Sequence, residues 1–113
     1  MKNLRNNVRL IGRLGVDPKV TKFENGKQVV SMRIATDESY KNKEGERVEN
    51  TQWHNLVVWN GLSKVAEKYL KKGMEITVEG RLVHRSYEDK NGKTVFVTEV
   101  EVHDLLMMGK KVS

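Results

Sequence analysis

The segment WNGLSKVAEKYLKKGMEITVEG, residues 59–80, joins one short amphipathic helix to the start of a long strand. Apolar residues in its first half recur at i, i+3 and i+4, which places them on one helical face; they are Leu62, Val65, Ala66, Tyr69 and Leu70. Asn60 is a candidate N-cap and Gly73 a candidate terminator, and the lysines at 71–72 suit the negative end of the helix dipole. We expect a single helix of about three turns.

The sequence on both sides of this helix is typical of strands. Val30, Met32 and Ile34 alternate with less apolar neighbours, the period of two that indicates a half-buried strand. In the last segment, Phe96, Val100 and Val102 are in phase. The predicted strands are Val8–Leu14, Val30–Ala35, Trp53–Trp59, Met74–Tyr87 and Val95–Leu106.

The turn residues agree with this division. Asn-Gly pairs at 25–26 and 91–92 accept the positive φ that a tight hairpin requires. Glycines at 12, 15 and 80 interrupt strands, as bends at barrel corners do. The charged stretch KNKEGERVEN, residues 41–50, predicts a mobile loop between the second and third strands.

Five strands with a helix between the third and the fourth is the order of the OB-fold, a five-stranded Greek-key barrel. The predicted fold class is therefore all-β, with residues 1–113 as a single domain. A five-stranded mixed fold of different topology is the alternative.

The charge of the chain favours a polyanionic partner. Lys and Arg number 21 against 15 Asp and Glu, and residues 1–36, with eight basic and two acidic side chains, account for the whole net charge of +6. Nucleic acid is the first candidate and an anionic membrane the second, although a soluble Lys-rich protein needs neither. The chain has no Cys, no signal-peptide pattern and no apolar run of about 20 residues, so we expect a soluble, cytoplasmic protein.

The third strand predicts a binding face. Alternation places Trp53 and Trp59 on one side, about 20 Å apart at most, and His54 with Leu56 and Val58 on the other. Because a barrel strand turns its aliphatic residues inward, both tryptophans would be exposed, which is typical of a contact surface. The alternative is that both belong to the core, since Trp is buried on average.

The fourth strand predicts a similar face. Arg81, Val83, Arg85 and Tyr87 share one side of it. Aromatic side chains stack on any base and interspersed cations follow the phosphates, so this pattern indicates binding of single strands without regard to sequence.

Five segments resemble the bacterial single-stranded DNA-binding protein family in order and spacing, over about residues 4–109. They are NNVRLIGRLGVDP (6–18), RIATDESY (33–40), TQWHNLVVWN (51–60), KVAEKYLKKGMEITVEGRL (64–82) and NGKTVFVTEV (91–100). The resemblance implies an OB-fold homotetramer that binds single-stranded DNA in replication, recombination and repair, with no cofactor. The protein would then be cytoplasmic and nucleoid-associated.

The resemblance also implies roles for particular residues. The four stacking positions correspond to Tyr40, Trp53, Trp59 and Tyr87, with Tyr where many relatives have Trp at the first and last, and Trp where they have Phe at the third. The phosphate contacts correspond to Lys72 and Arg85, and we extend this expectation to Arg33 and Arg81. His54 is expected at a subunit interface, near the first strand through which family members form dimers.

Typical family members continue into a Gly/Pro/Gln-rich tail with an acidic tip that recruits other enzymes. This sequence stops at KKVS, residues 110–113, so either the tail was removed or the natural protein has none. Recruitment of replication proteins is therefore not carried over.

The other function classes find less support. The three histidines lack zinc-ligand spacing, and adjacent acids at 37–38 and 88–89 point oppositely along a strand, so we expect neither a metal site nor catalysis. A nuclease would need clustered carboxylates, and an adaptor would leave the aromatic residues unexplained. An OB-fold primosome accessory factor or an RNA-binding OB-fold protein is the remaining alternative.

Overall fold

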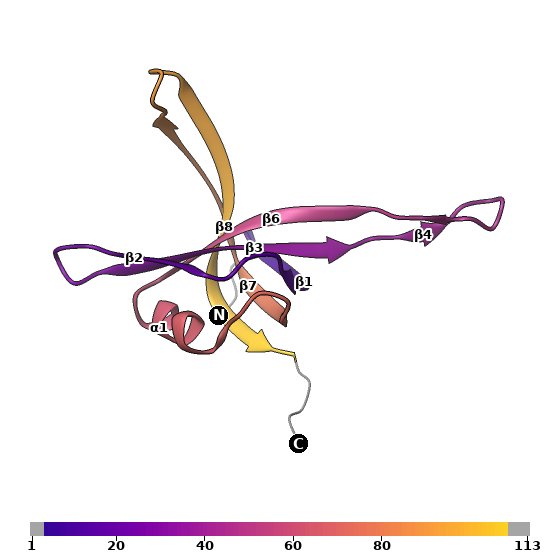
Figure 1. Cartoon of the computed structure of the whole chain (residues 1–113), viewed down its shortest axis with the longest axis horizontal. Helices are drawn as coiled ribbons and strands as arrows, with labels where there is room; N and C mark the ends of the chain where they lie inside the picture. Colours follow the sequence, from indigo (N-terminus) through magenta and orange to yellow (C-terminus); the bar gives the residue numbers. More distant parts are fainter. Residues whose placement is uncertain (1–3, 109–113) are drawn as a thin grey trace.

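The computed structural model describes residues 4–108, which fold into eight strands and one helix (Figure 1). In chain order these are β1 (Val8–Leu14), β2 (Lys19–Lys22), β3 (Gln28–Asp37), β4 (Tyr40–Lys41), β5 (Arg47–Val48), β6 (Thr51–Trp59), α1 (Asn60–Tyr69), β7 (Glu75–Glu88) and β8 (Thr94–Met107).

Five of the strands close into a ring, in the order β1-β7-β8-β6-β3 and back to β1. The ring is joined by a short parallel pairing, in which Leu56 of β6 lies opposite Val100 of β8, and by antiparallel pairing of β1 with β3 at Arg13 and Leu14. With α1 between the third and fourth ring strands, this is the predicted OB-fold barrel. β2 extends the sheet beyond β3 as a sixth strand.

The core follows from the period of two along the ring strands. The inward residues of β3 and β6 are buried, whereas their neighbours on β3 point outward. Ala66 and Leu70 bring the apolar face of α1 against the same cluster. The buried core comprises Leu14, Val30, Met32, Ile34, Leu56, Val58, Ala66, Leu70, Ile76, Val78, Val100 and Val102.

The ends of the helix differ from the prediction. Trp59, not Asn60, occupies the N-cap position, and its side chain makes no capping hydrogen bond. Asn60 lies inside the helix with φ of 55°, so its predicted role as N-cap is wrong. At the other end the helix stops at Tyr69. Gly73, with φ of 92°, lies in the following turn, where its N–H donates to Leu14 O at 2.8 Å.

Three hairpin arms project from the barrel (Figure 1). Two turn at the predicted Asn-Gly pairs, β2–β3 at 25–26 and β7–β8 at 91–92. The third, β4–β5, begins at Tyr40, and the rest of it lies in the stretch 41–50 predicted to be a mobile loop. Its turn is organised by Asn42, whose Oδ1 accepts the N–H groups of Glu44 and Glu46, both at 2.9 Å.

The outer part of β8 corrects another expectation. Phe96 is in phase with Val100 and Val102, but its side chain is 80% exposed. At this point β8 has left the barrel and pairs with β7 as a two-stranded arm, with Phe96 opposite Ser86. The alternation of apolar residues along β8 therefore extends beyond the part of the strand that contributes to the core.

Close approach of the backbone explains the glycine at 80. A Cβ on Gly80 would lie 2.0 Å from Glu101 O, whereas one on Gly61 of α1 would have nothing within 4 Å. We predict that Gly80→Ala lowers the free energy of unfolding by about 1–3 kcal/mol through steric strain. Gly61→Ala, the matched control, should raise it by up to about 1 kcal/mol because Ala favours the helix. Urea denaturation followed by circular dichroism measures both; equal stabilities of the Gly80 variant and the parent would contradict the close packing.

Candidate nucleic-acid interface

The outer faces of four barrel strands form one surface. On β6 the outward residues are Trp53, Asn55, Val57 and Trp59, and the register pairs each with an outward residue of β3. β8 joins β6 on the other side, with Glu101 opposite Val57, and β7 follows β8. The surface therefore also carries Arg81, Val83, Arg85 and Tyr87.

The predicted aromatic residues are exposed, and three of them lie on this surface. Their exposed fractions are 50% for Trp53, 40% for Trp59 and 47% for Tyr87. The interpretation of the tryptophans as core residues is therefore wrong, because the inward side of β6 is filled by Leu56 and Val58.

Trp53 is held by two neighbours at one end of the surface. The Arg33 guanidinium lies over the indole, with its carbon 4.9 Å from the ring centroid, a cation–π contact. Gly15 lies against the Cζ3–Cη2 edge of the ring, since a Cβ there would be only 2.3 Å from Trp53 Cζ3 and 2.6 Å from Cη2. Gly15 therefore leaves room for the indole, a role that the sequence pattern of a strand-ending glycine did not indicate.

Trp59 has an aromatic partner that the sequence analysis missed. Phe23, which follows β2, stacks on it with ring centroids 6.0 Å apart and planes inclined by 17°. Phe23 is itself 44% exposed. The sequence signal for it is an aromatic residue two positions before the Asn-Gly pair of the β2–β3 hairpin.

The arginines on β7 form ion pairs with acids on β8. Arg85 donates to both carboxylate oxygens of Glu99, from Nε at 2.9 Å and from a terminal nitrogen at 3.0 Å. Glu99 is buried, and its hydrogen bonds and charge raise the pKa of Arg85 further above its usual value. Arg81 likewise donates to Glu101 at 2.9 Å, which lowers the pKa of that carboxyl group. Both guanidinium groups are thus oriented on the surface.

Arg85 also approaches Tyr87. Its guanidinium carbon lies 5.8 Å from the phenol ring centroid, so the arginine connects the buried acid to the aromatic residue. The side chains on β7 and β8 thus repeat, around Tyr87, the combination of cation and ring found at Trp53.

Two adjoining hollows run along this surface and share Ser31, Arg85 and Glu99. The first is lined by Phe23, Trp59 and Arg81 among others, and the second by Arg33, Tyr87 and Lys19. We call the joined hollows the aromatic groove. It brings together Trp59, Tyr87, Arg33, Arg81 and Arg85 of the predicted site residues, with Trp53 stacked beside Arg33.

Two of the predicted DNA-binding residues lie away from the aromatic groove. Tyr40 is on β4, in the projecting β4–β5 arm. At the base of that arm, Asp37 accepts the Ser39 hydroxyl at 2.6 Å and the Ser39 N–H at 3.0 Å, which lowers the pKa of Asp37. Lys72 lies in the loop after α1, where its backbone N–H donates to Asp17 Oδ1 at 2.8 Å.

His54 lies on the opposite side of β6 from the tryptophans, as predicted. Its imidazole is partly buried and Nε2 lies 3.1 Å from Thr36 Oγ1. The register places it beside Ile34, whose other neighbour is Leu14 of β1, so His54 is close to the first strand.

The chemistry of the aromatic groove is that of a binding surface for a flexible anion with flat rings. Exposed aromatic side chains offer stacking platforms, and the guanidinium groups between them offer charged N–H donors. Within residues 4–108, no three His, Asp or Glu side chains gather in an arrangement that could hold a metal ion. The one helix in this range is too short and too polar to cross a membrane.

Known proteins resemble this chain over nearly all of its length. It is 41% identical over 107 residues to single-stranded DNA-binding protein 1 of Chlorobaculum tepidum, which covers 94% of this chain and 66% of that protein. It is 38% identical to single-stranded DNA-binding protein 1 of Xylella fastidiosa, covering 94% and 79%. For the single-stranded DNA-binding protein of Neisseria meningitidis the identity is 39%, with 92% of this chain but only 60% of the relative covered.

A solved structure agrees with the sequences. The SSB of Plasmodium falciparum in complex with ssDNA superimposes with a TM-score of 0.83 at 30% identity, covering 96% of this chain and 98% of that one. The model of the single-strand binding protein family matches residues 5–108. The chain folds as a closed OB-fold barrel with an aromatic outer face, and the family model matches nearly all of it. We conclude that the chain belongs to the single-strand binding protein family.

Proposed function

We propose that this protein binds single-stranded DNA through the aromatic groove, without regard to sequence and without catalysing a reaction. The observation that carries the proposal is the placement of Trp53, Trp59 and Tyr87, each 40–50% exposed, on one outer face of the barrel. Bases would stack on these rings, because every base has a π-face whatever its identity.

Arginines would contact the phosphates between the stacked bases. A guanidinium group has five N–H donors, and the pairing with Glu99 uses two of those on Arg85, so others are left for a phosphate oxygen. Arg33 covers one side of Trp53 and would place its charge next to a base stacked there. Lys72 and Tyr40 would extend the contacts, the lysine from the loop after α1 and the tyrosine from the β4–β5 arm.

The wider role that follows is the protection and organisation of single-stranded DNA in replication, recombination and repair. This role places the protein in the cytoplasm, with the nucleoid. It rests on the family relationship and on the groove. Since the chain spans 60–66% of two of the relatives described above, recruitment of other proteins by further segments is not part of the proposal.

Removal of a stacking ring should weaken binding without unfolding the protein. We predict that Trp53→Ala and Trp59→Ala each reduce the free energy of binding oligo-dT by about 1–3 kcal/mol, and that oligo-dT quenches tryptophan fluorescence of the parent. Fluorescence titration measures the affinity, and circular dichroism checks the fold. Phe96→Ala removes an even more exposed aromatic side chain, on the far part of β8, and is the control for loss of a ring. Parental affinity in both Trp variants would contradict the stacking, and parallel titration with oligo-U separates a DNA-binding from an RNA-binding protein.

The buried Glu99 carboxylate should reduce the positive charge that Arg85 offers to a phosphate in the aromatic groove. In Glu99→Gln the amide oxygen still accepts a hydrogen bond from Arg85, but the carboxylate that competes with phosphate is gone. We predict tighter oligo-dT binding and a log–log salt slope steeper by roughly 0.7, because one more cation is available to the strand. Glu75→Gln changes the net charge equally at the far end of β7 and should leave the slope unchanged. An unaltered slope in Glu99→Gln would show that Arg85 does not contact phosphate.

The proposed assembly is a homotetramer, with His54 near a subunit interface. Residues Val8–Gly12 of β1 pair with β7, while pairing with β3 begins only at Arg13, so this part of the strand offers an edge to a second subunit. Ile11 on this edge is exposed. A partly buried imidazole close to such an edge tolerates neither added charge nor added bulk if a subunit covers it.

We predict a mass near four times the 13.0 kDa of one chain at micromolar concentration. His54→Glu should shift the protein toward smaller species and weaken apparent DNA affinity, because it places a carboxylate in the interface. His54→Gln, which keeps a hydrogen-bonding group near Thr36, should remain tetrameric. Light scattering after size exclusion measures the masses. A parent mass near one chain would refute the assembly, and a tetrameric Glu variant would refute the position of His54.

A further inference from the structure

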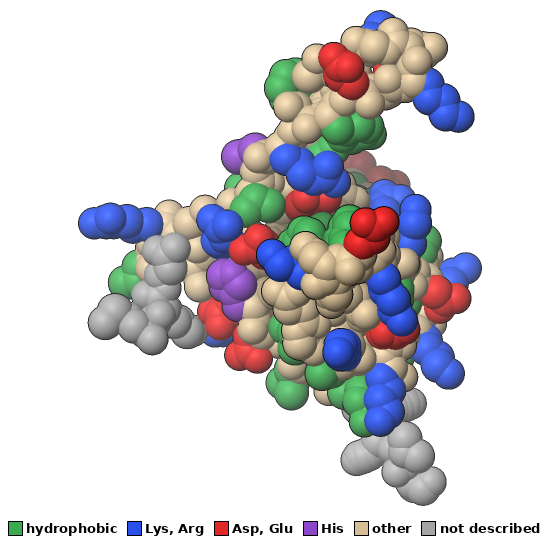
Figure 2. Space-filling model, turned by 90° about the vertical axis from the view of Figure 1, so that its left-hand side faces the viewer, with side chains coloured by type: hydrophobic (Ala, Val, Ile, Leu, Met, Phe, Trp, Pro, Cys, Tyr) green, Lys and Arg blue, Asp and Glu red, His purple; other side chains and the backbone are tan. Residues whose placement is uncertain are grey.

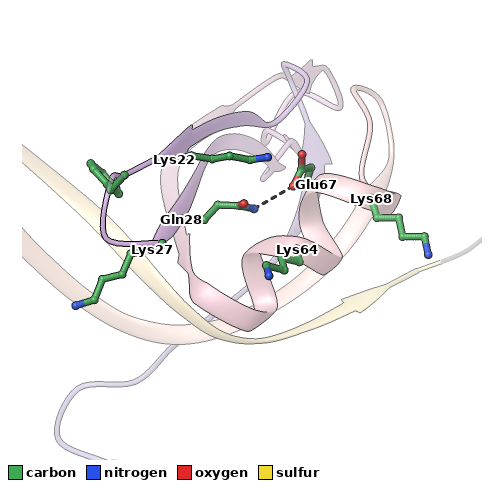
Figure 3. Close-up of a pocket in the computed structure, with 8 residues that line it drawn as sticks. Lys22, Lys27, Gln28, Lys64, Glu67 and Lys68 are labelled. Carbon is green, nitrogen blue, oxygen red and sulfur yellow. Dashed lines mark hydrogen bonds between the residues drawn. The ribbon is translucent and has the colours of Figure 1, made fainter.

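Four lysines line a second hollow, between the β2–β3 hairpin and α1 (Figure 3). Lys22 and Lys27 come from the two sides of the hairpin turn, and Lys64 and Lys68 come from the helix. The helical pair is spaced i, i+4 and therefore lies on one face. We call this hollow the lysine cleft; none of its lysines belongs to the predicted site.

A hydrogen bond joins the two walls of the lysine cleft. Gln28, at the start of β3, is buried, and its Nε2 donates to Glu67 Oε1 of α1 at 3.0 Å (Figure 3). The hairpin turn is closed by the Phe23 N–H, which donates to Lys27 O at 2.9 Å. These bonds fix the hairpin and the helix, and so the backbone positions of the four lysines, relative to one another.

The cleft has an excess of positive charge. Its lining contains four lysines and one carboxylate, Glu67, which leaves a net charge of +3. Within residues 4–108, none of the four lysines forms an ion pair with a carboxylate. In the view toward the hairpin and the helix, Lys and Arg side chains are spread over the surface (Figure 2). Arg81 and Arg85 of the aromatic groove differ, since both have acidic partners.

Phe23 makes the lysine cleft continuous with the aromatic groove. The same side chain lines both hollows, and its ring stacks on Trp59 at the groove's end. A strand that leaves Trp59 therefore reaches the lysines after passing one exposed aromatic ring.

We infer that the lysine cleft binds the phosphates of the same single strand where it leaves the aromatic groove past Phe23. This inference rests on the proposed function and extends the path of the strand to α1. Because the lining of the cleft has lysines but no aromatic residue other than Phe23, it contacts the backbone and not the bases. Lysine binds phosphate as a point charge, so the contact adds affinity without sequence preference.

The test uses oligo-dT of increasing length, from about 4 to about 16 nucleotides, the range of sites found for OB-folds. Lys64→Ala with Lys68→Ala removes two charges while Ala preserves the helix. We expect the longest oligonucleotide to lose roughly 5-fold in affinity per lost contact at 0.1 M salt, with a salt slope shallower by roughly 0.7 each. The shortest, held by the aromatic groove, should bind as tightly as to the parent. Lys64→Arg with Lys68→Arg keeps both charges and should behave as the parent at every length.

Three results would overturn the inference. Parental affinity of the Ala variant for all lengths would show that the strand does not reach the cleft. An equal loss at all lengths would show that the lysines act on the groove itself. Binding of a poly-glutamate peptide that the Ala variant loses, with long oligo-dT unaffected, would assign the cleft to an acidic protein segment. Failure of the proposed function is distinct, because the parent would then bind none of the oligonucleotides.

Discussion

The closure of the barrel by β1 is the constraint on which the remaining structure depends. This strand must pair with β7 along one side and reach β3 at its end, where Arg13 and Leu14 lie opposite Ala35 and Ile34. Such an approach is possible only because Gly12 has no side chain, since a Cβ there would lie 2.4 Å from Ala35 O. Once the ring is closed, each strand has an inner side committed to the core and an outer side free for function.

The outer side uses this rigidity for recognition. Trp53, Trp59 and Tyr87 stand on strands of the sheet, so their relative positions are set by backbone hydrogen bonds. Neighbouring groups then restrict the three rings: Gly15 and Arg33 at Trp53, Phe23 at Trp59, and Arg85 at Tyr87. Rings held in this way lose little conformational freedom on binding, which is a cost that flexible side chains would add.

The features that the sequence predicted are those that depend on local alternation. The exposure of both tryptophans follows from the inward position of Leu56 and Val58, and this part of the prediction is confirmed. The β2 strand was missed because KVTK is short and mostly polar. The stacking of Phe23 on Trp59 and the pairing of Arg85 with Glu99 depend on the register of strands distant in sequence, which alternation within one strand does not contain. Asn60 has a side chain that suits an N-cap, but it lies one position after the actual N-cap, Trp59, and its backbone is in a left-handed conformation.

The aromatic groove lies on the outside of a barrel, not in its interior, and its rings are about half exposed. A channel that encloses its ligand has to be threaded from a free end. A strand can instead be laid on an external surface from the side and lifted off in the same direction. By this geometry, a closed circle or a gap with duplex on both flanks would be as accessible to the groove as a linear fragment.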